Sequence, residues 1–290
     1  MGERNLGAAV AWMAGALVAF SISALSIRSL AKTLGLFEIL SLRSLAGIVL
    51  VGAYGLILAG GPRRLALRRP GLQFVRSLVH TGGQATWAYA ITLLPLATVF
   101  ALEFTSPVWL ALLAVPLLGE RLTLARIGAI GLGLAGVLVI LRPGLSTIQP
   151  ASLSALAAAL SFAITGIATK RLTATESTLA ILFWMNVMQL PMNLIGSDPL
   201  FPGRIEPWQA PALAGFCLSG VLSHLCLTQA YRNADATVVI PLDFLRVPLI
   251  AVVGWWVYGE VLDGFVLGGA AVVMTGIALN IFAEARRRPT

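Results

Sequence analysis

Three ionisable side chains lie inside long apolar segments, where an ionised group is costly. Glu103 is about six residues into one segment, and Asp243 and Arg246 share one helix face of another because they are three residues apart. A charge in the middle of a membrane helix costs about 2.5 to 3.5 kcal/mol on insertion scales, so such groups usually face protein or a water-filled cavity. We therefore expect all three side chains to point inward.

Glu103 is the residue that we expect to carry protons. Removal from water favours the neutral form of a carboxyl group, so a buried glutamate can exchange protons near neutral pH, as a proton-coupled carrier requires. The alternative is structural, with Glu103 held in a fixed ion pair that joins two helices.

Asp243 and Arg246 can neutralise each other while the chain inserts into the membrane. They also match a zwitterionic solute, because the arginine fork can hold a carboxylate while the aspartate holds an amine. The sequence leaves both interpretations open and makes the two residues candidates for substrate contact.

A polar stripe runs along the apolar segment 72–93. Arg76, His80 and Gln84 are four residues apart and Trp87 extends the stripe by about one turn, so the four side chains share one helix face. The stripe predicts a cavity lining, with His80 as a second candidate proton site. Hydrogen bonding between helices is the alternative, and it is favoured for a second polar set: Asn186, Gln189 and Asn193.

Other charged residues near the ends of apolar segments receive structural interpretations. Arg43 can extend to the membrane surface, with Glu38 little more than one turn away. Glu120 and Glu260 each follow a glycine at a helix end, and we expect them to fix tight turns rather than to bind substrate.

The composition shows why these charges stand out. Of 290 residues, 58% are hydrophobic and only 11% are charged, whereas soluble domains have roughly 25% charged residues. We therefore predict a membrane protein. Cys217 and Cys226 lie on opposite sides of one predicted helix and can neither pair nor complete a metal site.

Apolar runs of about 20 residues, the length that crosses the hydrocarbon, occur ten times. They cover residues 6–27, 37–59, 72–93, 97–118, 124–141, 151–169, 178–196, 210–231, 236–258 and 264–283. If the amino terminus is cytoplasmic, the outer loops hold only four cations, Arg28, Lys32, Arg142 and Arg204, and most others lie inside. The positive-inside rule thus predicts an all-α polytopic protein with both termini in the cytoplasm, and it explains the net charge of +8 without nucleic acid.

The second half of the chain repeats the first. A shift of 140 residues aligns the two halves without a gap from Ala90 to Gly136. The most informative matches are Gly119-Glu120 with Gly259-Glu260, and Glu103 with Asp243. Gln84 aligns with His224, which joins the cavity candidates. Because five spans per half is an odd number, residues 1–144 and 145–290 should form two inverted five-helix repeats.

Sequence motifs give little support to other classes of protein. The run from Gly131 to Gly136 has the spacing of a dinucleotide-binding loop, but no strand precedes it, so we expect helix packing there, as at Gly264 and Gly268. There is no Walker loop for ATP hydrolysis and no hydrolase or metalloprotease motif. A filter-like loop or a ring of like charges, typical of a channel, is also absent.

The sequence resembles the drug/metabolite transporter superfamily, in particular its ten-span EamA-type transporters. The resemblance rests on Glu103-Phe104-Thr105-Ser106-Pro107, Leu118-Gly119-Glu120-Arg121, Leu141-Arg142-Pro143-Gly144, Pro241-Leu242-Asp243-Phe244 and Tyr258-Gly259-Glu260. It implies secondary transport of small organic solutes by alternating access, commonly export, with a central cavity between the repeats. The second repeat departs from the first where Arg246 and Val247 replace Ser106 and Pro107.

We therefore expect a multi-pass carrier of the bacterial inner membrane that moves an amino acid or amine, coupled to protons. Uptake or exchange of a larger metabolite such as S-adenosylmethionine is the alternative, and an integral-membrane enzyme is a remote one. The expected partners are the solute, lipid and protons, with no cofactor, metal or nucleic acid, in a monomer or homodimer. The predicted site residues are Arg76, His80, Gln84, Trp87, His224, Asp243 and Arg246 for the solute and Glu103 for the proton.

Overall fold

The computed structural model describes residues 5–58, 61–93, 102–141, 150–246 and 264–286, together with residues 249, 252 and 256. Within these ranges the chain is helical and contains no strand, as the composition predicts. The helices are α1 (Leu6–Leu30), α2 (Leu36–Ala53), α3 (Pro70–Leu93), α5 (Ser106–Leu118), α6 (Leu124–Leu141), α7 (Pro150–Leu172), α8 (Thr178–Ile195), α9 (Ala210–Asn233), α10 (Ala236–Asp243) and α12 (Gly264–Arg286). A π-helical turn, Tyr54–Leu58, continues α2, and short 3₁₀ turns cover Pro62–Leu65, Phe201–Arg204 and Pro207–Gln209.

Five helical stretches in the described part of the chain are long and apolar enough to cross a membrane. They are Leu6–Ile27, Leu36–Ile57, Ala151–Leu172, Thr178–Ile195 and Pro207–Asn233. α3 has the length but not the hydropathy, because it carries the polar stripe. Each of the ten predicted ranges overlaps one of the described helices, while the count of ten spans and their direction stay predictions.

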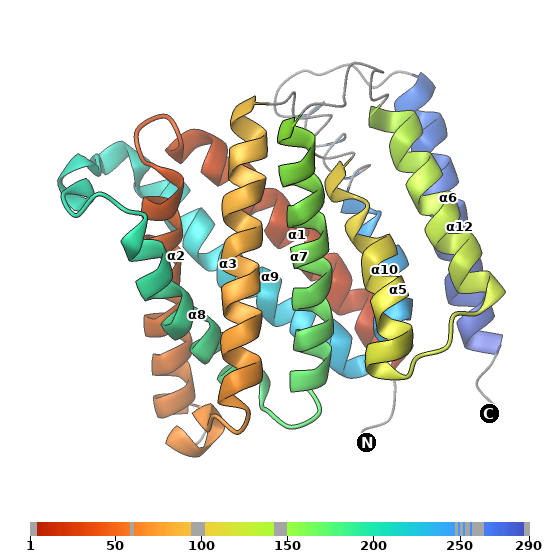
Figure 1. Cartoon of the computed structure of the whole chain (residues 1–290), viewed down its shortest axis with the longest axis horizontal. Coiled ribbons are helices and arrows are strands. Elements are labelled where there is room, and N and C mark those ends of the chain that lie inside the picture. The colour runs from red at the N-terminus through yellow and green to blue at the C-terminus, as the bar shows by residue number, and fades with distance from the viewer. Residues whose placement is uncertain are drawn as a thin grey trace.

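When the numbering is shifted by 140 residues, most of the helix pairs in the bundle map onto another pair or onto themselves. α1 packs against α9, and the shifted equivalents of these helices, α7 and α3, also pack against each other. α2 packs against α8 and α6 against α12, so each of these four helices meets its own equivalent (Figure 1). α5 packs against α10, which is not its equivalent. An arrangement with approximate twofold symmetry follows from these pairs.

The basic loops gather at one end of this bundle. The loop before α3 meets the turn after α7, where the main-chain amides of Arg68 and Arg69 donate to Glu176 at 3.1 and 2.7 Å. The Lys170 amine donates to the main-chain oxygen of Tyr231 at 2.6 Å, which brings the end of α9 to the same place. α1 begins and α12 ends at this end of the bundle as well (Figure 1).

Helical structure is interrupted at equivalent points in the two halves. Leu102 and Glu103 are helical, Phe104 and Thr105 form a turn, and α5 follows; α10 likewise ends at Asp243, before a turn over residues 244–245. In both turns one amide donates to the carbonyl three residues earlier, Thr105 to Leu102 at 3.1 Å and Leu245 to Leu242 at 3.2 Å. The interruptions lie beside Glu103 and Asp243, which 140 residues separate.

Close packing of α6 on α12 depends on glycines. A Cβ atom at Gly136 would lie 2.6 Å from the carbonyl oxygen of Gly269, and one at Gly276 would lie 2.9 Å from Cβ of Leu132. The predicted use of the Gly131–Gly136 run in helix packing is confirmed at Gly133 and Gly136. The prediction for Gly264 and Gly268 is wrong, because both face open space and the approach lies farther along α12.

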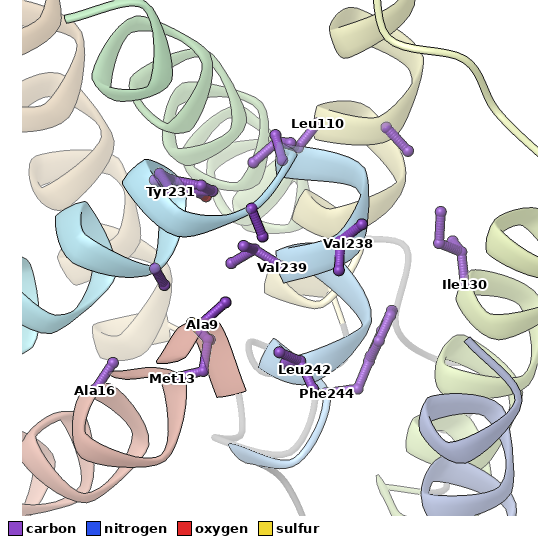
Figure 2. Packing of buried hydrophobic residues seen from close by; sticks show 14 of the residues in the cluster. Ala9, Met13, Ala16, Leu110, Ile130, Tyr231, Val238, Val239, Leu242 and Phe244 are labelled. Carbon is purple, nitrogen blue, oxygen red and sulfur yellow. The ribbon is translucent and has the colours of Figure 1, made fainter. Parts of the chain in front are cut away.

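Buried apolar side chains from seven of the described helices form the largest core cluster. Figure 2 shows Val238, Val239 and Leu242 of α10 between residues of α1, α5 and α9. Many large apolar side chains instead lie on the outer surface, including Ile57 and Trp256, which are 77% and 80% exposed. An outward apolar surface of this kind suits lipid, and it accounts for the low number of charged residues.

Replacement of Gly136 by alanine should lower the free energy of unfolding in detergent by about 1–3 kcal/mol, because the methyl group meets rigid backbone atoms of α12. Gly131→Ala is the matched control: this residue is in the same helix, faces open space, and should tolerate or gain from alanine. Equal effects of the two changes, measured by chemical denaturation, would contradict the packing described for α6 and α12.

Candidate functional site

Arg246 lies between two carboxylates that come from different halves of the chain. Its Nη1 atom is 3.2 Å from Oε1 of Glu103, and its Nη2 atom is 2.7 Å from Oδ1 of Asp243. The three side chains are 18%, 11% and 27% exposed respectively, so the group is largely withdrawn from solvent. The ion pair of Asp243 with Arg246, one of the two arrangements left open by the sequence, is present, and Glu103 extends it across the helix breaks.

Aromatic side chains surround this three-charge network. The indole nitrogen of Trp87 donates to Oε2 of Glu103 at 2.7 Å, so both oxygens of that carboxylate have partners. The guanidinium carbon of Arg246 lies 4.6 Å from the ring centroid of Phe20 and 5.8 Å from that of Phe104. Phe104 in turn stacks on Phe244, its equivalent after the 140-residue shift, with ring centroids 6.2 Å apart.

The predicted stripe on α3 is divided between two clusters. Trp87 belongs to the three-charge network, whereas Arg76 and His80 face α7, α8 and α9. The Nε atom of Arg76 donates to Oγ1 of Thr169 at 2.6 Å. Gln84 is half-buried, and its buried Oε1 atom has no hydrogen-bond partner among the described residues. No hydrogen bond to this atom therefore links Gln84 to either cluster.

The imidazole rings of His80 and His224 meet edge to face, with centroids 5.2 Å apart. His80 is also hydrogen-bonded through Nδ1 to Nε2 of Gln189 at 2.7 Å. Phe20 lies against His224 at a centroid distance of 6.5 Å, and the same ring lies under Arg246. One aromatic side chain therefore separates the histidine cluster from the three-charge network.

Two of the three polar residues on α8 join helices, as expected. Gln189 reaches His80 on α3, and Asn193 donates to Oγ of Ser44 on α2 at 3.2 Å. Asn186 is the exception, because its amide donates to the carbonyl of Leu182 in its own helix.

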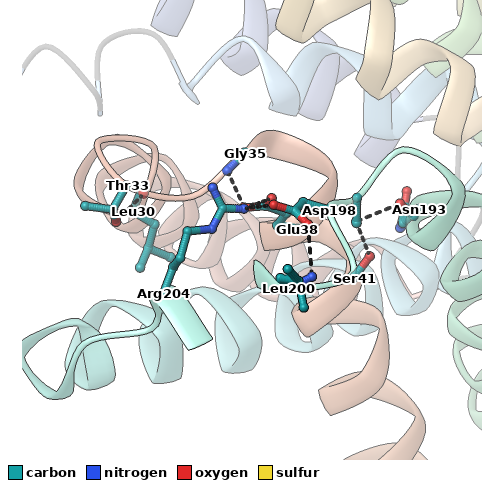
Figure 3. A network of polar contacts seen from close by, with 10 residues as sticks. Leu30, Thr33, Gly35, Glu38, Ser41, Asn193, Asp198, Leu200 and Arg204 are labelled. Carbon is teal, nitrogen blue, oxygen red and sulfur yellow. Dashed lines mark hydrogen bonds and ion pairs between the residues drawn. The ribbon is translucent and has the colours of Figure 1, made fainter. Parts of the chain in front are cut away.

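Arg43 does not extend to the surface beside Glu38. The guanidinium group of Arg43 lies 6.0 Å from the ring centroid of Phe216, and only 8% of the residue is exposed. Glu38 instead pairs with Arg204, which also lies 3.2 Å from Asp198 (Figure 3). The local spacing in the sequence could not reveal this, because Arg204 is far from Glu38 along the chain.

Glu120 makes a structural contact with another helix, whereas the sequence predicts that it fixes its own tight turn. Its Oε1 atom accepts a hydrogen bond of 2.9 Å from the amide of Ala236, the first residue of α10. Gly119 before it has a φ of 67°, which favours glycine and ends α5 in a tight turn. The corresponding residue Glu260 lies outside the described residues.

Both cysteines are free, in agreement with the sequence analysis. The residues that the structure describes contain no group of His, Cys, Asp and Glu side chains arranged to hold a metal ion.

A model of the EamA-like transporter family matches the chain twice, over residues 7–142 and 149–282. The chain belongs to this family. Its matches fall on both halves of the sequence and cover the helices that carry the three-charge network. The EamA assignment makes the protein a multi-pass membrane protein of a transporter family, as the resemblance implied.

Named relatives of this EamA chain are transporters of different solutes. A riboflavin transporter of Rhizobium johnstonii is 33% identical over 75% of this chain and 72% of its own length. An S-adenosylmethionine uptake transporter of Rickettsia prowazekii is 25% identical over 95% and 92%, and the pseudopaline exporter of Pseudomonas aeruginosa is 27% identical over 90% and 92%. A solved structure with a TM-score of 0.81 and 18% identity covers 98% of this chain and 100% of its own, and it shows the fold alone.

The contact between Trp87 and Glu103 can be measured through a double-mutant cycle. Trp87→Phe removes the indole donor and Glu103→Gln removes the charged acceptor, so the two changes should couple by about 1.5–3 kcal/mol in the free energy of unfolding. Trp184→Phe is the matched control, because its indole donates to the main-chain oxygen of Leu65 and shares no partner with Glu103. Additive effects of Trp87→Phe and Glu103→Gln would contradict the contact.

Proposed function

We propose that the protein is a secondary transporter that binds a small organic metabolite beside the Glu103–Arg246–Asp243 network and moves it by alternating access. The observation that carries the proposal is the position of this network at two equivalent helix interruptions. In secondary transporters built from inverted repeats, solute sites lie at interrupted helices between the repeats, where freed polar groups are available. An enzyme would need a catalytic set, and neither the sequence motifs nor the family supports one.

The proposed architecture has ten spans in two inverted five-helix repeats, residues 1–144 and 145–290. The pairing of α1 with α9 supports this arrangement, because the 140-residue shift maps it onto the pairing of α7 with α3. The gathering of the basic loops at one end supports a cytoplasmic position for that end and for both termini. The bacterial relatives support the inner membrane as the location.

Charge counting supports proton coupling. Two ionised carboxylates and one guanidinium group leave one negative charge in excess, in a site that is largely withdrawn from water. Uptake of one proton removes the excess charge, and Glu103 is the more buried of the two acids. Protonation would also weaken the ion pair that joins the halves, so that proton binding and helix separation become linked.

The same excess of negative charge favours an amine on the solute. An ammonium group beside Glu103 and Asp243 balances the site, and the rings of Phe20 and Phe104 offer it further favourable contacts. Arg246 is the predicted partner for a carboxylate, but both of its terminal nitrogens are already paired, so a carboxylate there must replace an acid. An amino acid or amine, exported from the cell, is the substrate that we propose.

Uptake or exchange of a larger metabolite is the second candidate. The printed names of the relatives favour it, since one takes up S-adenosylmethionine and another transports riboflavin. The pseudopaline exporter represents the opposite direction. The proposed partners in every case are the solute, membrane lipid and protons, with the protein as a monomer or homodimer.

Glu103→Gln tests the proton hypothesis. In proteoliposomes the variant should still exchange labelled solute across the membrane but should lose its response to an imposed pH gradient, because the amide cannot exchange a proton. Glu38→Gln is the control, since Glu38 is also a buried acid paired with an arginine, outside the proposed cavity. If Glu103→Gln keeps an undiminished dependence on the pH gradient, Glu103 is only a structural ion-pair partner.

A further inference from the structure

Two buried arginines have no acid beside them in the part of the chain that the structure describes. Arg76 is 2% exposed and Arg43 is 8% exposed, and neither forms an ion pair with any described residue. The other deeply placed arginines differ in this respect: Arg246 pairs with two acids, and Arg126 lies 3.5 Å from Asp235. A buried charge without a partner is costly, so a pair of them calls for a specific explanation.

The polar contacts of the two guanidinium groups are incomplete. Arg76 uses Nε for Thr169, while its buried Nη1 atom has no hydrogen-bond partner in the described part of the protein. Arg43 contacts the ring of Phe216, and within the described residues its guanidinium group has no hydrogen bond. Within the described residues, the buried Nη1 atom of Arg76 and the guanidinium group of Arg43 thus have no hydrogen-bond acceptor.

The fold brings these charges together from different helices. Arg43 is on α2, and its side chain lies on Gly220 of α9, one turn before His224. Arg76 is on α3, one turn before His80, and the rings of His80 and His224 meet with centroids 5.2 Å apart. Neither arginine has an ion pair within the described residues, so the cluster is positive where the three-charge network has an excess of negative charge.

The backbone makes room for Arg43. A Cβ atom at Gly220 of α9 would lie 2.6 Å from Cδ of Arg43, so the aliphatic part of this side chain lies directly on the glycine. Replacement of Gly220 would push the guanidinium group away from its position. The arginine is therefore held in place by the packing of α2 on α9 and is not free to leave the interior.

We propose that Arg43 and Arg76 form an anion-binding subsite of the transport cavity, which takes a carboxylate or phosphate group of the solute. The inference rests on the proposed transport function and specifies its substrate class: a metabolite with an anionic group at one end and an amine or aromatic group at the other. An oxyanion accepts hydrogen bonds from the free N–H donors and balances the two positive charges.

The geometry of α3 sets the length of such a solute. Arg76 and Trp87 mark the two ends on one face of this helix and are eleven residues apart, which corresponds to roughly 16 Å at 1.5 Å per residue. Phe20 lies between, in contact with both His224 and Arg246. A solute of this size can place its anion beside Arg76 while its other end reaches Glu103 and Asp243.

The test compares solutes that differ only in an anionic group. Binding to the purified full-length protein is measured for S-adenosylmethionine against decarboxylated S-adenosylmethionine, and for riboflavin 5′-phosphate against riboflavin. The wild type should prefer the anionic member of at least one pair, and the pair that responds distinguishes a carboxylate from a phosphate. Arg43→Gln and Arg76→Gln should each reduce this preference by about tenfold or more.

Matched variants separate the possible causes. Arg204→Gln removes an arginine that pairs with Glu38 outside the cavity and should keep the preference. Arg76→Lys keeps the charge and should lose less of the preference for the anionic solute than Arg76→Gln does. Gly220→Ala displaces Arg43 without removing it, and it replaces Arg43→Gln in the test if that variant does not fold.

The inference is overturned if the wild type shows no preference in either pair, or if the preference survives in both glutamine variants. If the preference for the anionic solute is lost only in Arg246→Ala, the anion is assigned to Arg246 instead. A binding preference without saturable solute exchange in proteoliposomes would contradict the transport proposal and leave the anion subsite standing.

Discussion

One guanidinium group shared by two acids joins the halves of this protein. Arg246 pairs with Asp243 in its own half and with Glu103 in the other, at the two points where helices are interrupted. Charges in a low-dielectric interior must be balanced locally, so any movement that separates the halves has to replace one of these ion pairs. A proton on Glu103 or an ammonium group of a solute can do so. The ion pair is therefore both a structural link and the point at which binding acts on conformation.

The helices position this network through packing contacts around the buried apolar core. Gly136 and Gly276 let α6 and α12 approach closely, and the stacked rings of Phe104 and Phe244 lie at the two turns beside the acids. Polar side chains then divide into an acidic site and a basic cluster, with Phe20 in contact with both. This separation of charge within one interior suits a solute that carries charges of both signs.

The sequence predicted features that depend on local spacing or on the repeat: the helical class, the match of Glu103 with Asp243, the ion pair of Asp243 with Arg246, and the inward direction of the α3 stripe. It could not predict contacts made only by tertiary packing. Phe20 is one apolar residue in an apolar segment, so the sequence does not mark it as a site residue. Arg204 is remote from Glu38 along the chain, and the burial of Arg43 depends on Gly220 of α9. The assignment of Gly264 and Gly268 to a helix contact failed because spacing alone does not reveal which face of α12 meets α6.

The central claim, that solute movement and proton movement are linked at the Glu103–Arg246–Asp243 network, is tested most directly by lumenal pH in proteoliposomes that contain the purified protein. Amino acids, amines, nucleoside-like metabolites and cationic drugs are added one at a time. The account predicts a saturating pH change that is specific to one class of solute. A constant lumenal pH together with saturable exchange of labelled solute would contradict it, and would describe a uniporter or exchanger in which Glu103 serves structure.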